Sequence, residues 1–143
     1  MHVQVWAARV LSLLLPGPGS RAILVTINQR YLRFFKTFEP SGRSVKVGLR
    51  FGSFKSTVVF SHLSHDDWWC SFGEAVSMIP KISSRRNLVI WTGDFNASAS
   101  SVVATNTGGA GVEEHRSRMH ALGEMADYLG LHFESLEIVV FSG

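Results

Sequence analysis

The stretch of sequence that decides the fold is LVIWTGDFNA, residues 88–97. Its first part belongs to Asn87–Thr92, a compact apolar run that predicts a strand buried on both faces. Gly93 then lets the backbone turn tightly. Asp94 and Asn96 stand two residues apart, so in extended backbone their side chains project to the same side. At the end of a buried strand, they would point into the crevice where open α/β sheets bind ligands.

The chemistry of this pair suits a metal ion and a water molecule. The carboxylate of Asp94 supplies charge to a hard cation, and the amide of Asn96 orients by hydrogen bonding. The alternative is a strand-ending Asx turn, in which the same side chains bond only their own backbone. The residue types leave both interpretations open.

Working towards the N-terminus, three apolar runs predict strands. Val45–Phe51 alternates between apolar and polar residues, which is typical of a half-buried strand, and Gly52-Ser53 turns it into the next. Asn28–Glu39 mixes aromatic and basic residues and is either strand or loop. The strands are Ala22–Ile27, Val45–Phe51 and one beginning with Thr57–Phe60, with a turn at Pro40-Ser41-Gly42 between the first two.

Two helices are expected around the central strand. The first is capped by Asp66 or Asp67, has apolar residues at helical spacing and stops at Pro80. The second is Glu113–Leu129, and Gly130 is a natural residue to end it. A long polar loop, Ala97–Gly111, precedes it and a last strand, Leu136–Phe141, follows it. This order of elements predicts a mixed α/β layer fold.

Histidine and cysteine supply the other candidate groups. His62 ends the strand before the first helix, where an imidazole could donate to a phosphate oxygen or a leaving group. The commoner alternative is a hydrogen-bonded loop histidine, and His65 is a weaker candidate still. The single cysteine, Cys70, stands beside two tryptophans and is expected to be a small buried hydrophobe. One cysteine and scattered histidines exclude a closed zinc site.

Composition points to a globular chain with a basic N-terminal half. Of 143 residues, 45% are apolar and 17% charged. Residues 1–50 carry eight Lys or Arg against one acid, Glu39. Such a surface can attract phosphates, although a solvated basic surface is the plainer interpretation. No apolar run is long enough to span a membrane.

The N-terminus divides from the rest at Pro16–Ser20. Residues 1–20 are interpreted as a leader or a replaced N-terminus, and residues 21–143 as the domain. The stretch only partly matches a signal peptide, so an intracellular location is favoured over secretion.

A strand, a His-Leu loop, an amphipathic helix, a second apolar strand and then Gly93–Ala97 together resemble the endonuclease/exonuclease/phosphatase superfamily. That family includes abasic-site endonucleases, pancreatic-type deoxyribonucleases, sphingomyelinases, inositol phosphatases and retroelement endonucleases. The resemblance covers roughly Ala22–Phe141 and is most specific at Gly93–Ala97. Ser61–His65 is similar to the His-Leu-Pro-His of retroelement members, with Ser64 in place of proline.

The resemblance implies a partial two-sheet α/β sandwich of the DNase-like type, a metal-dependent phosphodiester hydrolase. Asp94 would position the attacking water near Mg²⁺ or Mn²⁺, Asn96 would orient Asp94 and the phosphate, and His62 would contact the phosphate or leaving group. Nucleic acid or another phosphodiester would be the partner.

The departures from the family pattern imply a truncated and impaired copy. The family's metal-binding glutamate and its terminal Asp-His pair have no counterpart, so metal binding should be weak and the open sheet edges should favour self-association. The rival interpretation is a non-catalytic phosphate or nucleic-acid binding remnant of a decayed mobile-element endonuclease.

Overall fold

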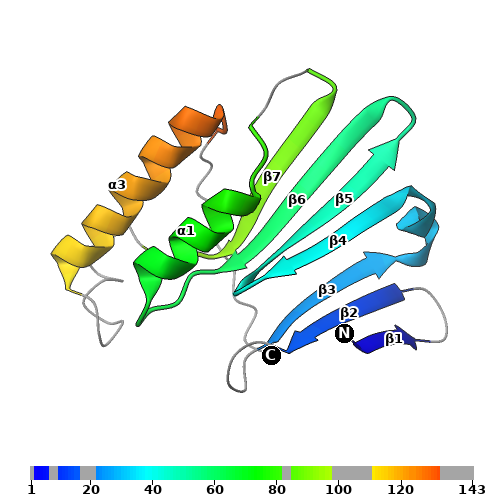
Figure 1. Cartoon of the computed structure of the whole chain (residues 1–143), viewed down its shortest axis with the longest axis horizontal. Helices are drawn as coiled ribbons and strands as arrows, with labels where there is room; N and C mark the ends of the chain where they lie inside the picture. The colour runs from blue at the N-terminus through cyan, green and yellow to red at the C-terminus, as the bar shows by residue number, and fades with distance from the viewer. Residues whose placement is uncertain (1, 7–9, 17–21, 82–84, 98–110, 133–143) are drawn as a thin grey trace, which may run out of the picture.

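The computed structural model describes residues 2–6, 10–16, 22–81, 85–97 and 111–132, which form two sheets and two α-helices (Figure 1). In chain order the elements are β1 (His2–Trp6), β2 (Val10–Pro16), β3 (Ala22–Asn28), the 3₁₀-helix η1 (Gln29–Phe34), β4 (Phe35–Ser41), β5 (Ser44–Phe51), β6 (Phe54–His62), α1 (Trp68–Met78), β7 (Asn87–Asp94) and α3 (Val112–Leu129).

The larger sheet has the strand order β4-β5-β6-β7. Strands β4, β5 and β6 are antiparallel neighbours, whereas β6 and β7 run parallel. The expected hairpin between β5 and β6 is confirmed, but β6 begins at Phe54, earlier than Thr57. The reason is that the two-residue turn at Gly52-Ser53 brings Phe54 directly opposite Phe51, so pairing starts at once.

Helix α1 makes the crossover that parallel strands require between β6 and β7. It ends before Pro80, as the sequence predicted. Asp67 is its N-cap residue, but the expected carboxylate cap is wrong, because the Asp67 side chain makes no capping hydrogen bond. The backbone carbonyl of Asp67 instead accepts from the N–H and the hydroxyl of Ser71.

Helix α3 and its end confirm the sequence prediction. Gly130 has φ 73°, the left-handed conformation that glycine adopts without a Cβ penalty, and its N–H bonds to the last turn of the helix. The buried residues recur at helical spacing along one face, and the picture shows α3 lying alongside α1 (Figure 1). These residues are His115, Arg118, Leu122, Ala126 and Leu129.

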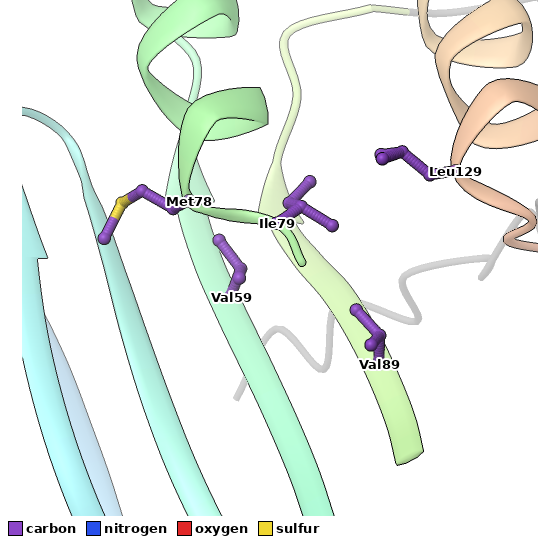
Figure 2. Packing of buried hydrophobic residues seen from close by; sticks show 5 residues of the cluster. All are labelled: Val59, Met78, Ile79, Val89 and Leu129. Carbon is purple, nitrogen blue, oxygen red and sulfur yellow. The ribbon is translucent and has the colours of Figure 1, made fainter. Parts of the chain in front are cut away.

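The two helices cover one face of the larger sheet. Met78 and Ile79, at the end of α1, and Leu129, at the end of α3, pack over Val59 of β6 and Val89 of β7 (Figure 2). All five side chains are buried. This cluster holds the helices at the amino-terminal half of β7, because Val89 is the third residue of that strand.

On the opposite face the sheet is covered only in part. Val25 of β3 packs with Val45 and Val47 of β5 in a second buried cluster. Leu88 and Ile90 of β7, however, are 45% and 41% exposed. The prediction that this strand is buried on both faces is therefore wrong. Its helix face is covered, while no described element covers the side chains of Leu88 and Ile90.

Strand β2 pairs antiparallel with β1 on one side and with β3 on the other, which forms the smaller sheet. The segment interpreted as a leader thus contributes two strands, and its origin stays a prediction. The undecided segment Asn28–Glu39 forms η1 and most of β4. Leu136–Phe141 and most of the Ala97–Gly111 loop lie outside the described residues.

The mixed α/β class is confirmed by the four-stranded mixed sheet and its helices. The finer prediction of a DNase-like sandwich is untested. Among the residues that the structure describes, no helix combines the length and the apolar character needed to cross a membrane.

Candidate functional site

Two of the three predicted site residues lie side by side where the parallel strands end. His62 of β6 is in register with Asp94 of β7, and the N–H of Leu63 donates to the carbonyl of Asp94 at 2.8 Å. Facing residues of neighbouring strands project to the same face, about 4.8 Å apart. Ser61 and Trp91 hydrogen-bond to each other on the helix face, so the alternation along β6 places the His62 side chain on the opposite face.

Gly93 permits this close approach of the two strands. Its φ of 146° is rarely adopted by residues with a side chain, and a Cβ atom built there would lie 1.8 Å from the carbonyl oxygen of Ser61. The backbone of β7 therefore approaches β6 at a distance that only glycine allows.

The backbone at Asn96 is not extended, so the premise that placed its side chain on the same side as Asp94 does not hold. Its φ is 44°, which breaks the extended geometry. Its backbone N–H donates to Asp94 Oδ1 at 3.1 Å, and its Nδ2 donates to the carbonyl of Leu63 at 2.7 Å. The Asx turn left open by the sequence is formed. The exposed Asp94 carboxylate keeps its second oxygen for other ligands.

A buried arginine on α3, absent from the sequence-based site, joins the two loops that carry these residues. Arg118 is 1% exposed and donates to the carbonyl of Asn96 at 2.9 Å and to the carbonyl of His65 at 3.0 Å. It also forms an ion pair with Glu114, one turn earlier. The loop after β6 and the loop after β7 are thus hydrogen-bonded to one side chain.

Trp68 of α1 reinforces this arrangement. Its indole N–H donates to the carbonyl of Phe95 at 2.7 Å, and its ring lies 5.6 Å from the Arg118 guanidinium carbon. Cation–π attraction adds to the packing at this distance. Side chains from both helices therefore hold the backbone that follows Asp94. They bind backbone carbonyl groups, which every residue has, so the sequence does not predict these contacts.

Arg118 nevertheless left one signal that sequence reasoning missed. It lies three residues after His115 and four before Leu122, on the stripe that α3 buries. A charged residue on a buried stripe is seldom found without specific partners. An arginine at such a position predicts that its guanidinium hydrogen-bonds to acceptors inside the fold.

Two histidines lie next to this arginine. The rings of His65 and His115 are 6.3 Å apart in an edge-on arrangement. Burial lowers the pKa of His115, and the positive charge of Arg118 and the proximity of His65 lower it further, against a smaller opposing effect of Glu114. The imidazole of His115 is therefore held in its neutral form over a wider pH range than in a free peptide.

Cys70 is exposed, so its expected burial is wrong. The first turn of α1 buries Trp68 and Ser71 and turns Cys70 to the other side of the helix. Asp67 and Glu74 raise the pKa of the thiol by repelling the thiolate. A thiol that stays protonated is a poor nucleophile, and we assign Cys70 no chemistry.

At a metal site, Asp94 would be the single carboxylate ligand that the described residues supply. Across the described residues, no three His, Cys, Asp or Glu side chains gather closely enough to hold a metal ion together. Mg²⁺ is commonly bound through one or two carboxylates, with waters and substrate phosphates completing its shell. A single exposed carboxylate such as Asp94 fits that pattern, with low affinity for the metal.

Comparison with known proteins gives no relative: no family model, no curated protein and no solved structure matches the chain significantly.

Proposed function

We propose that this chain is a metal-dependent phosphodiester hydrolase domain of the endonuclease type, with impaired activity. The observation that supports the proposal best is the register of His62 and Asp94 at the carboxyl ends of two parallel strands. A carboxylate and an imidazole fixed next to each other at such an edge supply a metal or water ligand and a proton donor together. The resemblance of Gly93–Ala97 to the endonuclease/exonuclease/phosphatase superfamily adds the reaction class.

Each side chain has one role in this proposal. Asp94 holds Mg²⁺ or Mn²⁺, which when bound polarises a phosphoryl oxygen and favours deprotonation of water. His62 donates a hydrogen bond or a proton to the phosphate or to the leaving oxygen. Asn96 fixes the Asp94 carboxylate through its backbone N–H, and its amide ties the loop to Leu63.

The rate should be low because few charges converge on the site. Removal of a single stabilising group at other active sites costs roughly a hundredfold to a thousandfold in rate. With one carboxylate where the family uses several groups, we expect turnover several orders of magnitude below that of an intact member. The activity would be visible only with protein in excess over substrate.

The test is single-turnover cleavage of plasmid DNA, an abasic duplex and a generic phosphodiester, with Mg²⁺, Mn²⁺ or EDTA. We expect slow, metal-dependent cleavage that disappears in Asp94→Ala and Asn96→Ala. Asp127→Asn, which removes an exposed carboxylate on α3, serves as the matched control and should cleave like the wild type. Cleavage that persists in Asp94→Ala would refute the assignment.

Metal binding can be measured separately by titration calorimetry. We expect weak binding of Mg²⁺ that is lost in Asp94→Ala, because one carboxylate carries it. Tight binding that survives this substitution would place the metal elsewhere.

A second candidate is a phosphate or nucleic-acid binding remnant without catalysis. The hydrogen bond that Asp94 Oδ1 accepts from Asn96, together with the lack of a three-ligand group in the described part of the chain, favours this alternative. Under this alternative, the chain binds oligonucleotides but does not cleave them with any metal ion.

A further inference from the structure

A third side chain continues the row formed by His62 and Asp94. The N–H of His62 donates to the carbonyl of Arg43 at 3.0 Å, so Arg43 lies opposite His62 just as Ser44 lies opposite Ser61. Arg43, in the turn between β4 and β5, therefore stands in one row with His62 and Asp94 across the end of the sheet. The order across the row is cation, imidazole, carboxylate.

Within the described part of the chain, the guanidinium of Arg43 makes no hydrogen bond. Its Nη1 atom is buried, yet it makes no hydrogen bond, and Arg43 forms no ion pair with any residue that the structure describes. Glu74 comes close to the neighbouring Gly42, where a Cβ atom would lie 1.9 Å from its carboxylate, but it does not pair with Arg43. Arg43 as a whole is half-buried, and a buried N–H group without an acceptor is unusual, which makes this guanidinium a candidate to bind an anion.

We propose that Arg43 binds the phosphate oxyanion of a phosphodiester at this edge. The fork of guanidinium N–H groups matches two phosphate oxygens, and His62 can donate to the same group. Two strand spacings, roughly 10 Å, separate Arg43 from Asp94. A phosphate bound above His62 would lie between the two, contacted by the Arg43 guanidinium on one side and by the metal or water of Asp94 on the other.

The proposal rests on the proposed function for the identity of the anion, but the binding itself needs no metal and no turnover. The probe is a labelled ten-nucleotide single-stranded DNA, titrated into the full chain in EDTA over a salt series. We expect Arg43→Gln to weaken binding roughly tenfold, as for loss of a charged hydrogen bond. The slope of log affinity against log salt should fall by about 0.7, the value for one phosphate contact on a single strand.

The matched control is Arg50→Gln. Arg50 lies near the far end of β5, the strand that Arg43 precedes; it is in register with Lys55 and is exposed. Arg50→Gln removes the same charge as Arg43→Gln. An equal effect of the two substitutions on the affinity and on its salt dependence would mean that DNA is attracted by the overall positive charge, and it would overturn the proposal.

Chemical protection of the wild-type chain gives a readout that does not depend on a variant folding. Phenylglyoxal modification of arginines, followed by mass spectrometry, should be slowed at Arg43 and not at Arg50 by the oligonucleotide. Protection by inorganic phosphate alone would support the same site with free phosphate as its ligand. Protection by neither overturns the proposal.

The two proposals can fail separately. Arg43-dependent binding with no cleavage in any metal leaves the anion site standing and removes the hydrolase. Cleavage that requires Asp94 and is unchanged in Arg43→Gln keeps the hydrolase and removes the anion site.

Discussion

Gly93 is the single residue on which the end of the sheet depends most directly. A methyl group there would lie 1.8 Å from the Ser61 carbonyl oxygen, and the φ of 146° would be strained. We expect Gly93→Ala to lower the free energy of unfolding by about 1–3 kcal/mol, measured by urea denaturation. Gly123→Ala, in α3 with no atom within 4 Å of the new methyl, should instead raise it by about 0.5–1 kcal/mol. Equal effects would show that β7 does not approach β6 this closely.

His115 should make stability depend on pH in a defined direction. Its pKa is lowered in the folded chain, mainly by burial and then by Arg118 and His65. Above the unfolded-state pKa of about 6.5 both states are neutral and the effect is absent. As pH falls below that value the unfolded state binds the proton first, so stability decreases until the folded-state pKa is reached.

Denaturant melts between pH 5 and 8 test this, with two variants as comparison. The loss of stability below about pH 6.5 should shrink in His115→Gln and remain in His120→Gln, because His120 is exposed in its contact with Glu124. An unchanged pH profile in His115→Gln would mean that another group controls it.

At the scale of elements, α3 is fixed to the sheet end by one of two neighbouring arginines. Arg118 is buried against two backbone carbonyls, while Arg116 pairs with Glu113 in full solvent. We expect Arg118→Ala to cost about 1–3 kcal/mol, because it leaves two part-buried carbonyls without their donor and removes an ion pair whose Glu114 side chain is 49% exposed. Arg116→Ala should cost less than about 1 kcal/mol. Thermal unfolding of both variants tests whether the hydrogen bonds of Arg118 hold the loops after β6 and β7 together.

Local pattern was enough to predict the elements with strong periodicity. The alternation of Val45–Phe51 and the helical stripe of α3 specify strand and helix because burial repeats with each period. Gly130 ends its helix because glycine adopts the left-handed conformation without a Cβ penalty, and this reason is local enough to be predicted from the sequence. Proximity of His62 and Asp94 follows once their strands are parallel neighbours, because both residues end their strands.

The features that sequence did not predict are set by contacts between distant segments. The conformation of Asn96 is tied to the carbonyl of Leu63, and Arg118 reaches carbonyls far along the chain. The outward position of Cys70 depends on which side of α1 meets the sheet. Backbone acceptors are common to every residue, so none of these partners could be read from side-chain identity.

At the scale of the whole molecule, β7 is a terminal strand of the larger sheet in the described part of the chain. Leu88 and Ile90 on its uncovered face are 45% and 41% exposed. Unpaired N–H and C=O groups along such an edge can pair with another chain, and adjacent apolar side chains add hydrophobic attraction. The same strand carries Asp94, so an association through this edge would also crowd the candidate site.

We therefore expect the isolated chain to self-associate, or to aggregate, as its concentration rises. The measurement is size-exclusion chromatography with light scattering, followed by thermal unfolding. The double variant Leu88→Thr/Ile90→Thr keeps strand propensity but removes apolar surface, and it should shift the chain towards monomer. Tyr128→Ser removes a 67% exposed aromatic from α3 and should leave association unchanged. A wild-type monomer with one cooperative transition at high concentration would mean that the face of β7 is covered, and the candidate site would then have to be sought under that cover.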